Sequence, residues 1–461
     1  MRFQLSAIVF LGFVFTDSRE SLADTIVDGK VANAIQDYAM AIHQQLGFSG
    51  AILAAKDGKV ILATALGTSG DGQNLDATSL FEIASCTKPF TAVAILQLVE
   101  DGKLTLDDPI SKHVPGVPGS CHSITIRHLV AHTSGIPGTN SRGSSEDAET
   151  AFRSFLRGGP KHKPGSHYEY WNQGYSILSE IISRASGDTY TRFVQKRIFN
   201  PAGMTASRFT GDEAPQGLVV AVGCSPHGHR SALSHPYGSY GFQYRGMGGL
   251  VTNVHDLWKF DRALKNRVLL KTPSIGEMIR PGISGYGLGW EIKSAPDGNA
   301  SHGHSGSVRG FRANIRRYPS IDGALFVLCN DEATTSLSIV RDGAEKILFG
   351  KRVNLTIPNR PSAALAESAK GSYVDSKKRR LVIGAGERGL PTLKIYWGGP
   401  VTHGFLGITA NGKPALYMMS RSENGFQFKV DSEIEFVSRD GEVWSTSLLG
   451  VSPKLTFVRQ D

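Results

Sequence analysis

The sequence predicts an α+β fold followed by a small all-β domain, and three features lead to this prediction. Strand-like runs lie near both ends of roughly the first 350 residues, helical patterns dominate between them, and short strand-like runs alternate with turn signals near the C-terminus. A sheet built from both chain ends around an inserted helical block is an α+β arrangement. The chain has 461 residues, too many for one ordinary core, so we expect two folded domains.

Residues 1–23 have the parts of a secretory signal peptide. Arg2 supplies a positive charge, an apolar run follows, and small residues end the segment at Ser21-Leu22-Ala23. The apolar run is too short to cross a membrane comfortably. We therefore expect secretion across the inner membrane, a periplasmic location and no stable membrane anchor.

The domain after the signal, residues 24–352, opens with a helix and a hairpin. Apolar side chains recur at helical spacing over residues 34–46, from Ile35 to Leu46. Two β-rich runs then flank Asp57-Gly58, a dipeptide typical of two-residue hairpin turns. These runs supply the N-terminal share of the predicted sheet.

The next segment, FEIASCTKPFTAVAILQLVEDG, carries the first candidate for chemistry. Ser85 and Lys88 lie three residues apart, which on a helix brings an amine within hydrogen-bonding reach of a hydroxyl. S-x-x-K alone is weak evidence, because a helix cap followed by a solvated lysine gives the same pattern. Here the residues after Pro89 are apolar nearly all round, as in a helix buried within a domain. That context favours a nucleophilic serine at a helix N-terminus.

The rest of the first domain continues the helical block and then returns to the sheet. A Gly-, His-, Ser- and Pro-rich stretch at 203–248 is expected to form functional loops. Helices are predicted at about 172–185 and 336–349, and strands at 286–292, 310–319 and 324–330.

A linker and a second domain complete the chain. Pro358 and Pro361, among Ala- and Ser-rich neighbours, indicate a linker over residues 353–370. In residues 371–461, strand-like runs alternate with turn signals such as Asn411-Gly412. This spacing predicts a small antiparallel barrel or sandwich.

Charge and cysteine content narrow the classes of partner. A formal net charge of +9 suits work among anionic envelope polymers, whereas an exported protein without a basic motif helix has no reason to bind nucleic acid.

Cys86 and Cys329 lie in apolar runs and are expected to be buried. Only Cys121 and Cys224 lie in loop-like sequence, and whether they pair is left open, because sequence does not give connectivity.

Two further short motifs contain side chains suited to acyl-transfer chemistry. Tyr170 and Asn172 come just before and at the start of a predicted helix, where a tyrosine near an amine could act as phenolate or proton shuttle. Taken alone, the tyrosine is more simply an aromatic at a loop–helix junction. His304 and Gly306 stand at a strand edge where a glycine lets a substrate approach the backbone, although an ordinary glycine-rich turn explains them as well.

In this order and context, the three motifs resemble the serine β-lactamase and penicillin-binding-protein superfamily. The resemblance covers roughly residues 28–350 and includes the phrases GKLTLDDPI, ITIRHLVAHTSGIP, NPAGMTAS, GGLVTNVHDLWKF and YGLGWEI. The most similar branch is the class C-like group with its esterases, D-aminopeptidases and DD-carboxypeptidases. The C-terminal region resembles the lipocalin-like domains attached to some members.

The resemblance implies a role for each motif residue. Ser85 would be the acylated nucleophile, with Lys88 as its base or proton relay and Tyr170 exchanging protons with nucleophile and leaving group. Substrate binding is implied for Asn172, His304 and Gly306. The backbone N–H groups of Ser85 and Ser307 would form the oxyanion hole, a feature that commonly supplies the largest catalytic term.

His304 departs from the Lys-Thr-Gly motif of true class C β-lactamases. A histidine is largely neutral above about pH 6.5, whereas the lysine stays charged. We therefore expect a serine hydrolase that cleaves short esters or D-amino-acid peptides, with β-lactams as a further substrate class. A β-lactamase or DD-carboxypeptidase proper, and a penicillin- or peptide-binding protein without turnover, are the alternatives.

The remaining histidines are not assigned to catalysis. His132 lies in a turn that matches the scaffold of the family. His227, His229 and His235 occupy the long loop without carboxylate or cysteine at ligand spacing, so we expect no metal there and no cofactor in the reaction. The expected partner is a small-molecule or peptide substrate, and oligomeric state is open.

Overall fold

The computed structural model describes residues 25–138, 148–225, 228–236, 244–332 and 336–353, and nine strands between residues 371 and 459. The predicted signal peptide and nearly all of the predicted linker lie outside the described residues.

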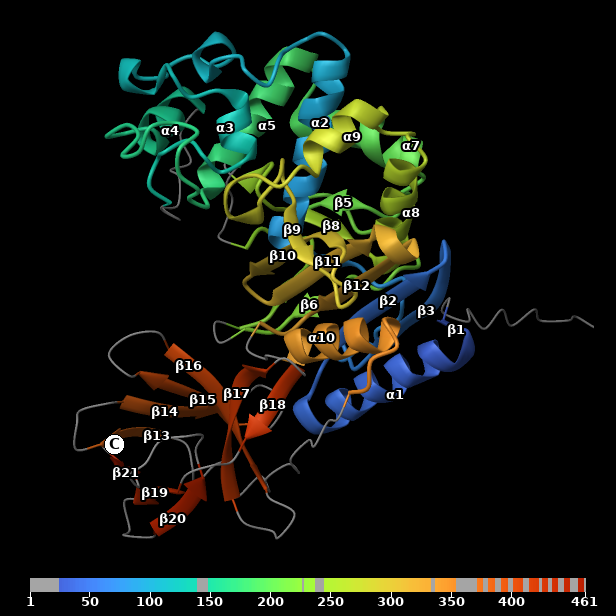
Figure 1. Ribbon diagram of the computed structural model, residues 1–461, viewed down its shortest axis with the longest axis vertical. Helices are drawn as coiled ribbons and strands as arrows, with labels where there is room; N and C mark the ends of the chain where they lie inside the picture. Colours follow the sequence, from blue (N-terminus) through green and yellow to red (C-terminus); the bar gives the residue numbers. More distant parts are fainter. Residues whose placement is uncertain are drawn as a thin grey trace, which may run out of the picture.

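A seven-stranded antiparallel sheet is assembled from both ends of the first domain, as the sequence predicts (Figure 1). Its strands are, in order across the sheet, β1 (Ile26–Val27), β3 (Lys59–Leu66), β2 (Gly50–Lys56), β12 (Gly323–Cys329), β11 (Phe311–Tyr318), β10 (Ala300–Val308) and β9 (Glu291–Ser294). The two chain ends meet where β2 pairs with β12, with Leu53 opposite Phe326. Both strands are almost wholly buried, because each face of the sheet is covered.

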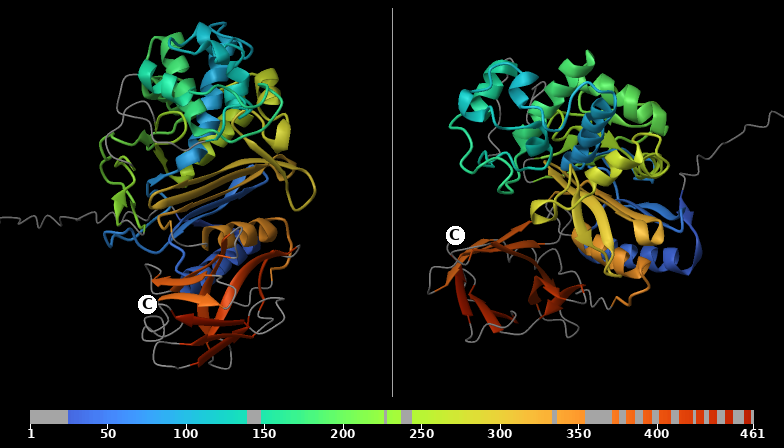
Figure 2. Two further views of the ribbon diagram at one scale, coloured as in Figure 1. Left: turned by 90° about the vertical axis from the view of Figure 1, so that its left-hand side faces the viewer. Right: turned by 45° about the horizontal axis from the view of Figure 1, so that its top comes forward.

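Two helices cover one face of this sheet, and the inserted block covers the other (Figure 2). Helices α1 (Gly29–Leu46) and α10 (Ser336–Leu348) pack together over the first face and enclose a separate apolar core. On the opposite face, helix α8 (Val254–Lys265) packs against β12 and β2. Trp171, Phe90 and many smaller apolar side chains form the larger core there.

The inserted block is mainly helical but not wholly so. Its other helices are the 3-10 turn η1 (Ala84–Thr87), α2 (Lys88–Glu100), α3 (Ile126–Val130), α4 (Ala148–Phe155), α5 (Asn172–Ser186), α6 (Tyr190–Val194), α7 (Asn200–Ala202) and α9 (Thr272–Met278). It also contains short strands: β4 (Phe81–Glu82), β8 (Leu250–Thr252) and β5 (Arg208–Phe209) form a small sheet, and β6 (Val222–Gly223) pairs with β7 (Arg230–Ser231). These two- and three-residue strands are too short to leave a periodic signal.

Local signals set several element boundaries correctly. The hairpin between β2 and β3 turns at Asp57 and Gly58, whose φ angles of 52° and 76° are those of a type I′ turn. The longest strand of this sheet was not predicted: β10 is rich in Gly, Ser and His rather than in the β-branched and aromatic residues that favour strands, and its pairing with β11 and β9 forms it nonetheless. Conversely, β9 begins only at Glu291, later than predicted.

The C-terminal region is all-β within the strands that the structure describes. They form one sheet in the order β18 (Gly425–Lys429), β17 (Pro414–Ser422), β16 (Val401–Ile408), β15 (Pro391–Tyr396), β14 (Arg380–Ala385), β13 (Gly371–Asp375), β21 (Leu455–Arg459), β19 (Glu433–Val437) and β20 (Val443–Ser447). Closure into a barrel and the lipocalin likeness stay predictions.

Two further findings concern the cysteines and the apolar character of the helices. Cys121 and Cys224 form no disulfide with each other, and both are buried. The Cys121 thiol instead donates to the carbonyl of Leu156. Within the described ranges, no helix combines the length and apolar character needed to cross a membrane.

Candidate active site

Ser85 lies in η1, between strand β4 and helix α2. The sequence analysis placed it on the helix itself, but α-helical hydrogen bonding cannot extend back to it, because Pro89 has no N–H to donate to the Ser85 carbonyl. The Lys88 N–H makes the shorter 3-10 bond to that carbonyl instead. Ala84 has φ +48°, a left-handed conformation that is rare outside glycine. Backbone strain of this kind clusters at functional sites.

Lys88, the first residue of α2, is fully buried and makes three polar contacts. Its Nζ lies 3.0 Å from the Ser85 Oγ, 2.8 Å from the Asn172 Oδ1 and 3.1 Å from the Met247 carbonyl oxygen. Burial lowers the pKa of Lys88 well below its ordinary value. Burial therefore favours the neutral amine over the ammonium ion.

The neutral form of Lys88 fits the contacts in a particular way. An NH₂ group has two protons, and the two carbonyl oxygens, of Asn172 and Met247, can only accept. Both protons are thus directed away from Ser85. The nitrogen lone pair is left for the Ser85 hydroxyl proton, which is the arrangement that a general base requires.

Helices α2 and α5 begin side by side at this point, with Lys88 and Asn172 as their first residues. Each helix N-terminus carries a partial positive charge. Two such ends oppose protonation of the amine between them, and they favour negative charge that develops on the serine oxygen. The geometry thus explains why both residues stand at helix starts.

Tyr170 completes the group around the nucleophile. Its hydroxyl is hydrogen-bonded to the Ser85 side chain, and its ring centroid lies 4.8 Å from the Lys88 Nζ. Burial raises the pKa of Tyr170 above its ordinary value, so the phenol keeps its proton. Of the two roles considered from sequence, this favours proton donation over a resting phenolate.

His304 lies inside β10 and is 1% exposed. Its Nδ1 is 2.7 Å from the Ser305 carbonyl oxygen, which can only accept, so that nitrogen carries the proton. Its Nε2 therefore accepts from the Tyr286 hydroxyl at 2.9 Å. Burial lowers the pKa of His304 to about 4. The imidazole is neutral, and both of its nitrogens are already occupied.

Gly306 allows the strand to approach the nucleophile. A Cβ at this position would lie 2.2 Å from the Ile83 carbonyl oxygen and 3.2 Å from the Ser85 backbone nitrogen. Strand β10 therefore runs directly beside the Ser85 N–H, one residue before Ser307. The backbone around Gly306 is thus close to the Ser85 N–H, as an oxyanion hole built from Ser85 and Ser307 would require.

The comparisons with known proteins agree with this arrangement. A family model described as Beta-lactamase matches residues 32–347, more than half of the chain. The chain belongs to the beta-lactamase family. It is accordingly a serine hydrolase of the β-lactamase-like type, and the matched range includes Ser85, Lys88, Tyr170, Asn172 and His304.

Two bacterial proteins with curated names are similar to this chain in sequence. Penicillin-binding protein 4* of Bacillus subtilis is 30% identical over 344 residues, which are 68% of this chain and 75% of that protein. Protein flp of Staphylococcus aureus (strain N315) is 31% identical over 308 residues, 60% of this chain and 59% of that protein. The matches thus span between three fifths and three quarters of these relatives.

Solved structures share the fold. The octameric penicillin-binding protein homologue from Pyrococcus abyssi has a TM-score of 0.60 at 25% identity and covers 85% of this chain and 96% of its own. D-amino acid amidase from Ochrobactrum anthropi SV3 has a TM-score of 0.59 at 24% identity, over 70% of this chain and 98% of its own.

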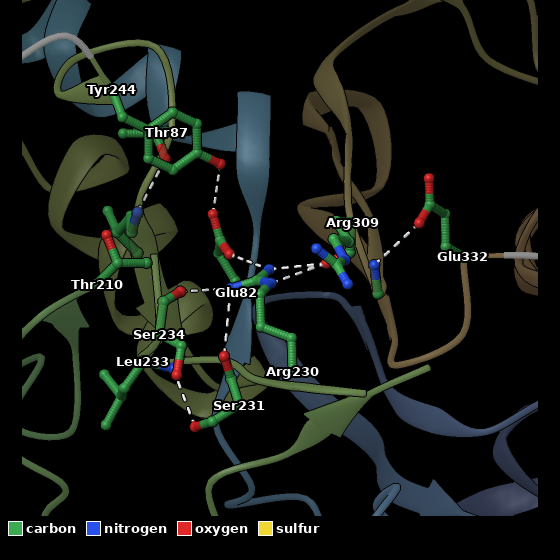
Figure 3. Close-up of polar contacts among 12 residues, drawn as sticks. Glu82, Thr87, Thr210, Arg230, Ser231, Leu233, Ser234, Tyr244, Arg309 and Glu332 are labelled. Atoms are coloured by element: carbon green, nitrogen blue, oxygen red, sulfur yellow. Dashed lines mark hydrogen bonds and ion pairs between the residues drawn. The ribbon is translucent and has the colours of Figure 1, made fainter. Parts of the chain in front are cut away.

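A buried ion pair that was not singled out in the sequence supports the active-site strands (Figure 3). Glu82, three residues before Ser85, binds the guanidinium of Arg230 and the hydroxyl of Tyr244, and all three are buried. Arg230 also donates to the carbonyl of Arg309, in the turn between β10 and β11. Through Arg230, strand β4 is thereby connected to the 203–248 segment and to the turn that follows strand β10. Only the fold reveals this, because the partners are far apart in sequence.

His132, which the sequence analysis assigned to the scaffold, lies behind Tyr170. The two ring centroids are 4.3 Å apart, and His132 Nδ1 accepts from the Trp171 backbone N–H. Its φ of +56° and nearly complete burial fit a structural role. It positions the segment that carries Tyr170 and does not touch Ser85 in any described contact.

Proposed function

We propose that this chain is an exported hydrolase that forms an acyl-enzyme on Ser85 and cleaves ester or amide bonds of small substrates. Short esters and D-amino-acid peptides are the favoured classes, and β-lactams are poorer ones. The observation that carries the proposal is the buried Lys88 amine, whose pKa is lowered by burial, 3.0 Å from the Ser85 Oγ. A lysine whose pKa is lowered in this way takes the serine proton more readily than an ordinary surface lysine does.

The proposed reaction has two halves. Ser85 Oγ attacks the substrate carbonyl while its proton passes to Lys88, and the Ser85 and Ser307 N–H groups stabilise the oxyanion. Tyr170 gives its proton to the leaving alcohol or amine, and the proton held on Lys88 restores the phenol. Water then attacks the carbonyl of the acyl-enzyme and gives one proton to the Lys88–Tyr170 pair. That proton passes to the Ser85 Oγ as its ester bond breaks and the acid product is released.

Neutral substrates are favoured because His304 provides no cation. In this fold position a charged lysine would meet a substrate carboxylate, whereas His304 is uncharged and bonded to Tyr286 and Ser305. Asn172, bound to Lys88, is the residue we assign to orienting the substrate amide. Gly306 leaves the backbone open to the substrate.

A second candidate function is acylation without turnover, as in a penicillin- or peptide-binding protein. The names of the relatives favour it: one is a penicillin-binding protein of Bacillus subtilis. The Tyr170–Ser85 hydrogen bond favours turnover instead, because only turnover needs a proton-transfer partner for deacylation. A β-lactamase or DD-carboxypeptidase proper would use the same residues on an anionic substrate.

Export and domain division belong to the same proposal. The pattern of residues 1–23 supports cleavage of a signal peptide and a periplasmic product. The nine C-terminal strands pair only with one another, which supports a separately folding domain over 371–461 after a linker at 353–370. Limited proteolysis should cut near the linker and leave two resistant fragments; cuts scattered through the last hundred or so residues would contradict the division.

A substrate panel tests the proposed function. Wild type and Ser85→Ala are assayed with nitrocefin, short p-nitrophenyl esters and D-amino-acid anilides, and a fluorophosphonate adduct is mapped by mass spectrometry. We expect turnover of esters or anilides that Ser85→Ala abolishes, and a label on Ser85 alone. A stoichiometric acyl adduct without turnover would favour the binding protein. Full activity in Ser85→Ala would refute both.

A further inference from the structure

A second group of potentially metal-binding side chains lies in the segment that leads into Tyr170 and ends one residue before it. These side chains play no part in the proposed reaction. His162, His167 and Glu169 each place one ligand atom within 4.8 Å of the others. The two imidazole rings are tilted by 34° with centroids 4.4 Å apart. Both histidines are exposed and Glu169 is half-buried, so solvent and small ions reach the group.

The loop that carries these side chains is fixed to its neighbour by backbone hydrogen bonds. Lys161 N–H donates to the Gly135 carbonyl at 2.7 Å, and Gly165 N–H donates to the Thr133 carbonyl at 2.8 Å. Near the end of the loop, Glu169 N–H donates to the His132 carbonyl at 2.9 Å. The three side chains therefore project from a backbone that is already in place.

Glu169 is itself held in position. Its Oε1 accepts from the Gly138 N–H at 2.6 Å, which fixes the carboxylate and leaves Oε2 for another partner. A carboxylate oriented by a hydrogen bond is the usual state of a metal-ligating carboxylate.

Two imidazoles and one carboxylate are the donor set of zinc-class ions. Ca²⁺ and Mg²⁺ prefer oxygen ligands only, so two imidazoles select against them. Bonds of about 2.0–2.1 Å place the ligand atoms of a tetrahedral zinc site roughly 3.3 Å apart. The exposed histidines need only a small rotamer adjustment to close from 4.8 Å to that separation. We propose that His162, His167 and Glu169 bind one divalent transition-metal ion of the zinc class.

Neighbouring charges affect how strongly this group binds a metal ion, and its position determines what the binding does to the rest of the site. Lys161 and Lys163 flank His162 and are exposed, so their repulsion is screened but weakens binding. A bound ion would lock the loop that leads into Tyr170, because Glu169 is both a ligand and the preceding residue. The bound ion would thus restrict the motion of the segment that carries Tyr170 and would take no part in the reaction at Ser85.

Calorimetric titration of metal-stripped, untagged protein with Zn²⁺ tests the proposal. Wild type and Ser85→Ala should each bind one equivalent, and His162→Ala or His167→Ala should weaken binding at least tenfold. His122→Ala is the matched control, because His122 is also exposed but lies outside the group, and it should bind as wild type does. Tetrahedral Co²⁺ absorption should appear in wild type and be lost in His167→Ala.

Thermal melts keep the test valid if a variant is unstable. Without metal, His167→Gln should melt as wild type does, and Zn²⁺ should raise the Tm of wild type only, because an ion that binds the folded state stabilises it. Absence of saturable one-to-one binding in wild type would overturn the proposal. So would equal Zn²⁺ affinity in wild type and both histidine variants.

Discussion

Lys88 and His304 are two buried bases in the elements around Ser85, and they differ in the partners of their nitrogen atoms. Burial lowers the pKa of both, to about 4 for His304, and so favours the uncharged form of each. The Lys88 amine donates to two carbonyl oxygens and keeps its lone pair for Ser85. Both nitrogens of His304 are bonded to Tyr286 and Ser305.

The comparison shows that burial sets the protonation state, whereas the hydrogen-bond partners decide the role. A neutral base with an unused lone pair aimed at a hydroxyl can take its proton. A neutral base whose two nitrogens are both hydrogen-bonded within the protein cannot accept that proton and has a structural role in the site. We therefore assign proton transfer to Lys88, and packing and charge selection to His304.

The largest expected effect comes from removing the Lys88 amine. Lys88→Met keeps the length and apolar stem of the side chain in its buried position but leaves Ser85 without a base. We expect kcat/KM for an ester substrate to fall by roughly 10³-fold or more, within the range that general-base catalysis supplies. The steady-state rate and a circular dichroism check of folding measure this.

The same substitution at an exposed lysine is the control. Lys112 has a side chain that is 59% exposed, so Lys112→Met should leave kcat/KM unchanged. Ser85→Ala combined with Lys88→Met should lose no more activity than Ser85→Ala alone, because the two residues act as a unit. Retention of near-wild-type rates by Lys88→Met would make the lysine a structural residue.

A smaller loss is expected at the oxyanion strand. In Gly306→Ala the new methyl group would lie 2.2 Å from the Ile83 carbonyl oxygen, so strand β10 must move away from Ser85. A displacement of about 1 Å can cost 10²-fold in rate. Crowding should also lower the free energy of unfolding by about 1–3 kcal/mol, measured by denaturant titration.

Gly276→Ala provides the contrast, because nothing lies within 4 Å of the added carbon and the residue is within α9. It should leave activity unchanged and raise the free energy of unfolding by about 0.5–1 kcal/mol. If Gly306→Ala behaves like Gly276→Ala, strand β10 does not supply the oxyanion donors.

The smallest effect on rate is expected on the His304 side. Tyr286→Phe removes the donor to Nε2 and leaves a buried acceptor unpaired, which costs about 1–3 kcal/mol of stability. Because His304 takes no part in proton transfer, kcat/KM should fall less than tenfold.

Tyr318→Phe is the control, on the far side of the sheet. It loses a hydrogen bond to Glu345 and should lower the free energy of unfolding without any change in kcat/KM. A rate loss in Tyr286→Phe as large as that of Lys88→Met would give His304 a catalytic role.

The sequence predicted most of the sheet, the Asp57-Gly58 hairpin and the residues around Ser85, because these depend on local patterns and on motifs of fixed spacing. It did not predict that His304 is buried and bonded to Tyr286, which keeps it neutral well below pH 6.5. Whether a histidine is charged depends on its burial and on Tyr286, which lies eighteen residues away along the chain and pairs with it only in the fold. The Glu82–Arg230 pair and the His162–His167–Glu169 group went unnoticed for a similar reason. Their spacing matches no familiar motif, and only loop geometry brings them together.

The central claim, a neutral active site that prefers uncharged substrates, is tested most directly by one ratio. The kcat/KM of a short neutral ester is divided by that of nitrocefin, which carries a carboxylate, from about pH 5.5 to 8.5. Burial lowers the pKa of His304 to about 4, so the imidazole stays neutral across this range. We predict a ratio that favours the ester and stays flat with pH. A preference for nitrocefin at pH 7.5, or a ratio that changes with a midpoint near 6.5, would contradict the account.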